Sequence, residues 1–484
     1  GQMTVDTQND PNKVRIRSVL GDSGTVTRKV AAGDEDGDGT QDADLDLTIP
    51  GMFFGVYKGS VDNGSNRMKD WFWNHKMTET LRENEDEPLI ELHLPYNSEE
   101  EWTEYLSTHD VASWGVQLLK QDYWWMTPNS PPSDSSFHSE LHSLWNPYPT
   151  KWPNGMVLGT LAHSYGLQMS LYMCNTYQDT TLTDWTGRVK DFTAIATRLK
   201  DWNIDYYRSD FSLEGPDGSR NYAAHEGFLW VLDSLLSDPD LPNFHYEHCS
   251  GGGCLKDFTS LERMTFMTTE DSGRALQHRI VAYANSYMIN PVQLKVDNSI
   301  DWAPLEGSYT DQDAWDYYSL RTGLMGAMMV CPSTTLSGFT DHQIEVAKET
   351  YNLYNTKQRE ILRNCDVYHI LPSPDGVNWD GLEYFNDNIE KGSIVLFRPG
   401  DQSETEKVIY PDGLQENTVY SVTFEDDTDL NGTRTGKDLM ENGISVKMDL
   451  DYDSEVIWLE AQTVPVSEII VSGAAELQQG KTTT

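Results

Sequence analysis

The sequence has little positive charge, few cysteines and no long apolar run. Its 35 lysine and arginine residues face 77 aspartate and glutamate residues, so the formal net charge is −42. Because such a field repels phosphates and anionic headgroups, we expect no nucleic-acid partner. No apolar run reaches the roughly 18 residues of a transmembrane helix, so we also expect no membrane insertion. The acidity selects no substrate, since it also keeps proteins solvated.

The five cysteines are too sparse, and odd in number, for a small disulfide-rich scaffold. At 484 residues the chain is long enough for several domains of roughly 100–200 residues each. Its first and last residues suggest a piece of a longer chain.

Hydrophobic periodicity divides the chain into four segments. Residues 1–85 are predicted to be β-rich. Residues 86–365 alternate short apolar runs with amphipathic ones, which is typical of a parallel sheet with crossover helices and predicts a (β/α)8 barrel of the α/β class. In residues 366–462, apolar and polar residues alternate with period two between turns, which predicts an antiparallel β-sandwich. Residues 463–484 resemble a linker and the first strand of a bacterial immunoglobulin-like repeat, as in secreted and cell-surface proteins.

Two helices of the predicted barrel are visible in the pattern. Val189, Phe192, Ala196 and Leu199 recur on one helical stripe. Residues 340–343 have capping-box spacing, so a late barrel helix is expected to start there.

Acidic or reactive residues follow four of the predicted strands. They are Asp122, Asp210, the Cys-Ser-Gly-Gly-Gly run at 249–253, and the pair Glu270 and Asp271. A (β/α)8 barrel builds its site from the loops at the carboxyl ends of its strands, so we expect these residues to converge. A loop or helix cap is the alternative for any single aspartate among them.

Two of these carboxylates suit glycoside hydrolysis, which needs one group to attack the anomeric carbon or activate water and another to protonate the leaving oxygen. We predict that Asp210 and Asp271 are these catalytic residues. Arg208 precedes Asp210 by two residues, so on a strand both side chains project from one face and the cation holds the carboxylate ionised.

Aromatic and glycine residues add two weaker signals. Trp73, Trp124 and Trp125 are predicted to stack on sugar faces, with ordinary core packing as the alternative. Glycines 251–253 let a ligand approach the backbone closely, or form only a tight turn.

Two metal sites compete with simpler interpretations. Positions 1, 3, 5 and 9 of a calcium loop are matched by Asp34, Asp36, Asp38 and Asp42. Position 12 is Leu45, so a solvated acidic loop is the alternative. A zinc site is the other hypothesis, with ligands His245, His248, Cys249 and Cys254. These residues lack the paired spacing usual for zinc.

Taken together, these segments resemble glycoside hydrolase family 36, which comprises α-galactosidases, α-N-acetylgalactosaminidases and raffinose-type enzymes. The family motif Glu-x-Cys-Ser-Gly-Gly-Gly is matched by residues 247–253, and the family segment Asn-Arg-Met by residues 66–68. The resemblance covers the chain from about residue 50 to 460. It implies an N-terminal β-sandwich, of which this chain would hold a remnant, then a barrel and a C-terminal β-sandwich.

The resemblance also implies roles for single residues. The family strand end Lys-Trp-Asp, with Asp as the nucleophile, aligns with residues 208–210. The acid/base segment aligns with residues 268–271, where Asp271 is preferred and Glu270 is the reserve. Asp122 matches the turn whose carboxylates bind the 4- and 6-hydroxyls of galactose. With the tryptophans, the predicted substrate-binding set is Asp122, Trp124, Trp125, Arg208, Cys249, Ser250, Gly251, Gly252, Glu270 and Trp73.

The chain departs from the family pattern at three positions. Arg208, Ser209 and Gln121 stand where the family has Lys, Trp and Asp. An arginine fork binds oxygens differently from an ammonium, so the pocket is predicted to differ from that of an ordinary α-galactosidase. The family stretch matched by residues 249–252 faces the C2 substituent, which could be hydroxyl, acetamide or amine.

The sequence therefore predicts a retaining exo-α-glycosidase, extracellular or at a bacterial cell surface. It would release terminal galactose-configured sugars from an oligosaccharide or glycoconjugate by double displacement. No catalytic cofactor is expected, and calcium would be structural. The alternatives are a non-catalytic carbohydrate-binding protein with a decayed site and a raffinose-synthase-like transglycosylase.

Overall fold

The structure is a computed structural model of the chain. The residues that it describes are 2–6, 15–19, 55–94, 96–122, 125, 146–173, 185–210, 222–249, 253, 257–270, 274–298, 311–330, 339–400 and 402–462.

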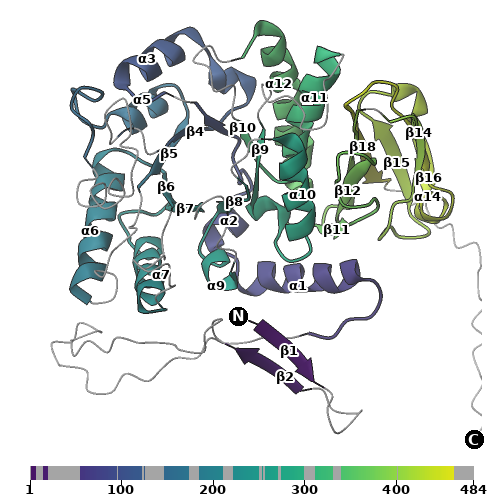
Figure 1. Ribbon diagram of the computed structural model, residues 1–484, viewed down its shortest axis with the longest axis horizontal. Coiled ribbons are helices and arrows are strands. Elements are labelled where there is room, and N and C mark those ends of the chain that lie inside the picture. The colour runs from purple at the N-terminus through teal and green to yellow at the C-terminus, as the bar shows by residue number, and fades with distance from the viewer. Residues whose placement is uncertain are drawn as a thin grey trace, which may run out of the picture.

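Eight short parallel strands close into a barrel, which confirms the predicted fold (Figure 1). The order of neighbours around the barrel is β10-β3-β4-β5-β6-β7-β8-β9. The strands are β3 (Glu91–His93), β4 (Leu118–Gln121), β5 (Gln168–Tyr172), β6 (Tyr206–Ser209), β7 (His245–His248), β8 (Phe266–Thr268), β9 (Leu294–Asn298) and β10 (Ala327–Val330).

Helices between the strands cover the outside of the barrel (Figure 1). They are α3 (Glu99–Thr108), α5 (Leu158–Ser164), α6 (Trp185–Asp201), α7 (Tyr222–Leu236), α9 (Phe258–Leu261), α10 (Ala275–Asn285), α11 (Gln312–Arg321), α12 (Asp341–Leu353) and α13 (Arg359–Leu362). A π-helical turn, Tyr354–Gln358, joins the last two. The predicted helical stripe lies on α6, and Thr340 caps α12 with both hydrogen bonds of a capping box, so both helix predictions are confirmed.

The segment before the barrel is only partly β-structure. Its described elements are β1 (Gln2–Asp6), β2 (Arg15–Val19), α1 (Val61–His75) and α2 (Glu79–Glu83). The prediction of a β-rich segment through residue 85 was therefore wrong for the two helices. Ser60 and Asn63 form a capping box that starts α1, and Phe72 and Trp73 on this helix are buried. The capped start and this buried face favour a helix over a strand.

An antiparallel sheet follows the barrel and confirms the second predicted unit. Six strands pair in the order β11-β12-β13-β18-β15-β16, and β14 pairs with β17. These elements are β11 (Asp366–Tyr368), β12 (Asp380–Asn386), β13 (Lys391–Arg398), β14 (Glu406–Ile409), β15 (Val419–Phe424), β16 (Gly432–Thr435), α14 (Gly436–Asn442), β17 (Ile444–Lys447) and β18 (Asp453–Ala461). Side chains from both sheets share one apolar core, separate from that of the barrel.

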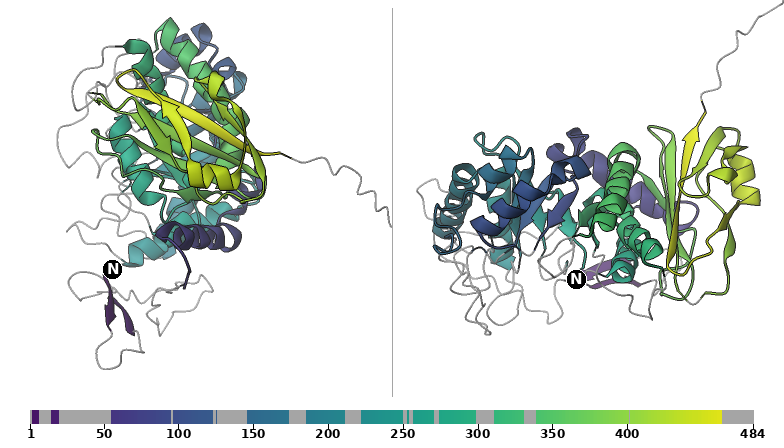
Figure 2. Two further views of the ribbon diagram at one scale, coloured as in Figure 1. Left: turned by 90° about the vertical axis from the view of Figure 1, so that its right-hand side faces the viewer. Right: turned by 90° about the horizontal axis from the view of Figure 1, so that it is seen from above.

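The C-terminal sheet stands against α10 and α11 on one side of the barrel (Figure 2). Arg279 on α10 binds Asp380 on β12, with Nε at 2.8 Å and Nη2 at 3.1 Å from the two carboxylate oxygens. Arg321 on α11 donates to Asp426, at 2.8 Å from Nη2 to Oδ1, and to the Ser454 carbonyl. Arg279 and Asp380 are fully buried, so the two units are joined by a desolvated ion pair.

Within the described residues, no helix combines the length and apolarity needed to cross a bilayer.

Candidate active site

The interior of the barrel changes from apolar to charged along its axis. Near the amino-terminal end, an apolar cluster fills it, made of Leu89, Leu118, Tyr206, Phe266 and Ala327. Two residues later along β4, β6 and β8 come Lys120, Arg208 and Thr268, all buried. Because side chains on one face of a strand recur every second residue, these three also point inward. The charged layer therefore lies on the carboxyl-terminal side of the apolar one.

The same alternation brings predicted site residues to the carboxyl end of the barrel. Four inward-facing residues each stand two positions before a residue that the sequence assigned to the site. The pairs are Lys120 and Asp122, Arg208 and Asp210, Glu247 and Cys249, and Thr268 and Glu270. Four strands thus direct one predicted residue each to the same edge, which is where a (β/α)8 barrel places its site. Asp210 is only 8% exposed, and the Asp122 side chain is 16% exposed.

Arg208 lies at the centre of the charged layer. Its Nη1 donates to Glu247 Oε1 and, at 3.3 Å, to Thr268 Oγ1. Its Nη2 lies 3.9 Å from Asp122 Oδ2. The guanidinium therefore links β4, β6, β7 and β8 beneath the strand ends, and a planar fork suits this role better than a single ammonium.

A second set of charges continues across the barrel. Lys295 Nζ donates to Glu247 Oε1, the same oxygen that Arg208 contacts, and lies 2.7 Å from Glu91 Oε1. Glu91 Oε1 is also 3.7 Å from Lys120 Nζ. All these side chains are buried, and Lys120 brings the chain of charges back to β4, the strand that carries Asp122. We call the six residues Asp122, Arg208, Glu247, Lys295, Glu91 and Lys120 the charge ring.

The charge ring shifts the pKa values of its members. Burial alone would raise the pKa of Glu247, but Arg208 and Lys295 hold it well below its usual range, so Glu247 is ionised. Burial and the Glu247 charge raise the pKa of Glu91 to about 7. Burial would lower the pKa of Arg208, yet Glu247, Asp122 and Asp210 contribute to raising it well above its usual value. The guanidinium beneath Asp210 therefore stays charged.

His93 on β3 lies beside this ring without adding to its charge. Desolvation and the Lys120 ammonium lower the pKa of His93 to about 3. Its Nε2 is 3.9 Å from Asp122 Oδ2. At neutral pH the imidazole is therefore uncharged, and Arg208 is the cation that balances Asp122.

Two predicted sugar-stacking tryptophans lie elsewhere, so these predictions were wrong. Trp125 is fully buried, donates to the Tyr172 carbonyl at 2.8 Å and packs edge-on against Trp202. Trp73 lies on α1 and is 7% exposed, and the Arg363 guanidinium stacks over its ring. Both tryptophans fill core space, which was the alternative given by their residue type.

Several predicted residues lie outside the described parts of the chain. They are Asp34, Asp36, Asp38, Asp42, Trp124, Ser250, Gly251, Gly252 and Asp271. Their assigned roles, including the calcium loop, stay predictions. Among the residues that are described, no group of three or more His, Cys, Asp or Glu side chains is placed to hold a metal ion.

The end of the glycine run is explained by close packing. Gly253 has φ of +76°, and a Cβ at this position would lie 2.3 Å from the Thr268 carbonyl oxygen. Its amide donates to the Cys249 carbonyl at 2.7 Å. A tight turn therefore accounts for Gly253, and it brings the strand end that carries Cys249 against the end of β8.

The zinc hypothesis fails for its two histidines. His245 is in phase with Glu247 and faces the barrel interior, where it stacks on Tyr206 and lies 3.5 Å from Glu87. His248 is out of phase with Glu247, and its Nδ1 lies 3.2 Å from Ser209 Oγ. Because adjacent side chains on a strand point to opposite faces, His245 and His248 cannot bind one ion.

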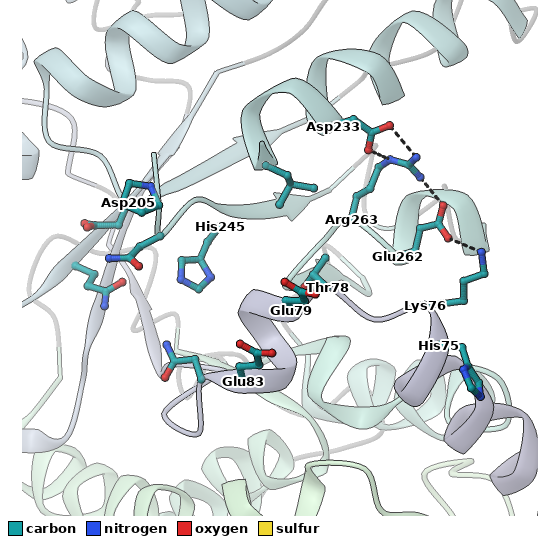
Figure 3. Close-up of a pocket in the computed structure, with 15 residues that line it drawn as sticks. His75, Lys76, Thr78, Glu79, Glu83, Asp205, Asp233, His245, Glu262 and Arg263 are labelled. Atoms are coloured by element: carbon teal, nitrogen blue, oxygen red, sulfur yellow. Dashed lines mark hydrogen bonds and ion pairs between the residues drawn. The ribbon is translucent and has the colours of Figure 1, made fainter. Parts of the chain in front are cut away.

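A separate cavity of about 1000 Å³ lies at the amino-terminal end of the barrel (Figure 3). Its wall carries a chain of ion pairs: Asp233 binds Arg263 at 2.6 Å, Arg263 binds Glu262 at 2.7 Å, and Glu262 lies 3.4 Å from Lys76. The strands that border it contribute their first residues, Gln168 and His245. The cavity is therefore at the wrong end of the barrel to include Asp210.

No family model matches the sequence. Among known proteins, it is 22% identical over 456 residues to the probable α-galactosidase C of Aspergillus oryzae, which covers 84% of this chain and 58% of the relative. It is also 22% identical over 281 residues to α-galactosidase 2 of Hypocrea jecorina, covering 57% of this chain and 36% of the relative. Over most of its length the chain is therefore distantly similar to α-galactosidases.

Solved α-galactosidases share the fold of this chain. The family 36 α-galactosidase AgaA of Geobacillus stearothermophilus superposes with a TM-score of 0.67 at 17% identity, covering 84% of this chain and 60% of the other. The α-galactosidase of Lactobacillus brevis gives 0.68 at 14% identity, covering 84% and 59%. The chain thus spans a little under two thirds of the length of these relatives.

Four members of the charge ring had no assigned role in the sequence analysis: Glu91, Lys120, Glu247 and Lys295. A signal for them does exist. Lys120 lies within the apolar run of its strand and is in phase with Asp122, and Lys295 interrupts a similar run between Leu294 and Val296. A charge inside a barrel strand must be paired in the interior, because isolated burial is costly.

Proposed function

We propose that this chain is the catalytic core of a retaining exo-α-glycosidase that acts on terminal α-linked sugars of galactose configuration. The observation that carries the proposal is the position of Asp210. It comes directly after β6, two residues beyond the buried and permanently charged Arg208 and in phase with it. A carboxylate at the carboxyl end of a barrel strand, next to a fixed cation, is suited to attack an electrophilic anomeric carbon.

The proposed reaction is a double displacement. Asp210 attacks C1 as the leaving oxygen takes a proton from the acid/base residue, which gives a glycosyl-enzyme of inverted configuration. The same acid/base residue then takes a proton from water, and the resulting oxygen nucleophile displaces Asp210 from C1. Two inversions restore the α configuration. No cofactor takes part in either step.

The acid/base residue comes from the pair Glu270 and Asp271. The sequence resemblance favours Asp271, with Glu270 as the reserve. The alternation along β8 favours Glu270, because Glu270 is in phase with Phe266 and Thr268, whose side chains face the interior. We therefore propose Glu270 as the first residue to test.

Other residues of the site would select the sugar. Asp122, beside Arg208, would accept hydrogen bonds from sugar hydroxyls, and Cys249 would border the C2 substituent. Gln121, which stands where the family has a second aspartate, is fully buried and turned aside. Its Oε1 accepts from Trp102 Nε1 at 2.7 Å and its Nε2 donates to the Asp122 carbonyl at 3.0 Å. One carboxylate partner for the sugar hydroxyls is therefore missing on β4.

This difference suggests a pocket that tolerates a change at C6 of the sugar. A solved family 27 β-L-arabinopyranosidase of Geobacillus stearothermophilus has a similar fold, with a TM-score of 0.54 at 10% identity, covering 82% of this chain and all of the other. Arabinopyranose has the ring configuration of galactose without C6. We therefore include it among the substrates to be tested.

The test is a panel of nitrophenyl glycosides followed by proton NMR of the first product. The panel holds α-galactoside, α-N-acetylgalactosaminide, α-galactosaminide and β-L-arabinopyranoside, so it varies C2 and C6 separately. We expect turnover of at least one substrate and initial release of the sugar with retained configuration. Initial release of the inverted anomer, or no turnover of any member, would contradict the proposal. Excess acceptor sugar separates hydrolysis from transfer.

The cellular location and the metal content of the protein are also proposals. We propose a secreted or cell-surface protein whose acidic loop at residues 34–42 binds structural calcium. Dialysis against a chelator should then lower the melting temperature without affecting kcat below it. An unchanged melting temperature would remove the calcium proposal and leave the glycosidase proposal intact.

A further inference from the structure

The charge ring contains a shared oxygen on which two cations depend. Arg208 Nη1 and Lys295 Nζ both contact Glu247 Oε1, while Glu247 Oε2 accepts from Ser170 Oγ at 3.2 Å. The position of Arg208 therefore depends on how strongly Lys295 is drawn to that same oxygen. Glu91 is the other carboxylate that Lys295 contacts, at 2.7 Å.

Glu91 lies at the far side of the barrel from the proposed nucleophile. It is fully buried on β3, and within the described residues its Oε2 has no hydrogen-bond partner. The charged groups around Glu91 come from three strands: Lys120 from β4, Lys295 from β9 and Glu247 from β7, with Arg208 beyond Glu247. Met329 on β10 adds an uncharged sulfur, 3.4 Å from Lys120 Nζ.

We infer that Glu91 is a positioning residue, which shares Lys295 with Glu247, limits the pull of Lys295 on Glu247 Oε1 and so keeps Arg208 fixed beneath Asp122 and Asp210. An ionised Glu91 completes an alternating order of charges around the ring. If Glu91 is neutral, Lys295 has Glu247 as its one charged partner in the ring and competes with Arg208 for Oε1. The inference rests on the proposed function, because Arg208 matters only if Asp210 is the nucleophile.

The electrostatics of the ring place the ionisation of Glu91 near neutral pH. Burial and the Glu247 charge raise the pKa of Glu91 to about 7, from an ordinary value of 4.5. Below that pH the carboxyl is neutral and the ring loses one negative charge; above it the alternation is complete. The unfolded chain releases this proton near pH 4.5, whereas the folded protein keeps it up to about pH 7. The free energy of unfolding therefore falls as the pH rises between these two values.

The test compares Glu91→Gln with a matched control, Glu87→Gln. Glu87 is also fully buried inside the barrel, but it lies at the amino-terminal end, where it contacts Tyr206, His245 and the Leu89 amide. Within the described part of the chain it contacts no member of the ring. Glu91→Gln keeps an acceptor for Lys295 and removes the titratable charge. We measure kcat and KM between pH 5.5 and pH 8.5 on whichever aryl glycoside the wild-type protein hydrolyses, and unfolding by urea over the same range.

We expect Glu91→Gln to equal the wild-type protein near pH 6 and to have a lower kcat at pH 8. The loss should be about tenfold, the rate equivalent of one pKa unit of differential interaction, with KM changed less than kcat. The fall in wild-type stability between pH 5.5 and pH 7 should shrink in Glu91→Gln and persist in Glu87→Gln. A purely structural role would lower activity equally at every pH.

Three results would overturn the inference. One is a kcat for Glu91→Gln that follows Glu87→Gln at every pH; another is a loss independent of pH. The third applies if Glu91→Gln does not fold, when the wild-type protein alone tests the inference. It is a wild-type kcat/KM profile that shows no ionisation between pH 6 and pH 8. Failure of the proposed function looks different: the wild-type protein then neither hydrolyses the panel nor binds the iminosugar 1-deoxygalactonojirimycin in calorimetry.

Discussion

At the amino-terminal end of the barrel, Asp233, Arg263, Glu262 and Lys76 form a linear chain of ion pairs on the wall of an open cavity. At the carboxyl end, the six residues of the charge ring also alternate in sign, but nearly all are withdrawn from solvent. Water screens the first set, so each pair contributes little. The second set lies in a low dielectric, where one charge alters the position and the pKa of the next.

The difference explains why the amino-terminal cavity is not the candidate site. The amino-terminal cavity has room, yet its Asp233 side chain is half exposed and already paired with Arg263. The carboxyl end instead holds Asp210 next to a buried, permanently charged arginine. Chemistry at an anomeric carbon needs fixed charges at defined positions, which burial provides and an open surface does not.

The largest expected effect is that of removing Asp210. Asp210→Ala should lower kcat on the best aryl glycoside by about 10⁴-fold or more, because a nucleophile has no substitute. Circular dichroism and the melting temperature should stay near those of the wild-type protein, since Asp210 is at the edge of the core. External azide should restore part of the activity and give a β-glycosyl azide. Turnover like that of the wild-type protein would contradict the assignment of Asp210 as the nucleophile and of the carboxyl end of the barrel as the site.

The next effect separates the two acid/base candidates. Glu270→Gln should lower kcat/KM by roughly 10²–10⁴-fold on substrates with poor leaving groups, and less on dinitrophenyl glycosides, which need little protonation. Asp271→Asn should have the smaller effect if the alternation of β8 continues past its end, since Asp271 would then fall on the opposite face from Glu270. The opposite ranking would show that the strand alternation does not continue through residue 270.

A buried ion pair outside both ends separates stability from activity. Asp380→Asn leaves the Arg279 guanidinium buried without its charged partner and should lower the free energy of unfolding by about 3–5 kcal/mol. The kcat measured well below the melting temperature should not change, because this pair joins the barrel to the C-terminal sheet. A large loss of kcat in a folded variant would instead mean that the sheet supports the site.

The smallest effect is expected at the amino-terminal cavity. Asp233→Asn breaks the exposed pair with Arg263 and should change the free energy of unfolding by about 1 kcal/mol or less, with kcat unchanged. Urea unfolding and initial rates are enough to measure both. An activity loss comparable to that of Glu270→Gln would contradict the contrast between the two ends.

Much of the architecture could be predicted from local patterns. The spacing of apolar runs gave the parallel barrel, and the change to period two after residue 365 gave the antiparallel sheet. The prediction was wrong for α1 and α2, where residues 55–85 carry polar stretches that hide a helix with a narrow buried face. Trp73 and Trp125 were assigned to the site by residue type, and residue type does not distinguish a stacking surface from a filled core.

The sequence alone determined which strand ends carry acidic residues, because a charge after an apolar run is visible without any coordinates. Only the tertiary structure decided that Arg208, Glu247, Lys295 and Glu91 meet in one ring. Their strands are far apart in the chain and become neighbours or face one another only when the barrel closes. Pairing across a closed barrel depends on strand register, and register is set by the packing of the whole sheet rather than by any local pattern.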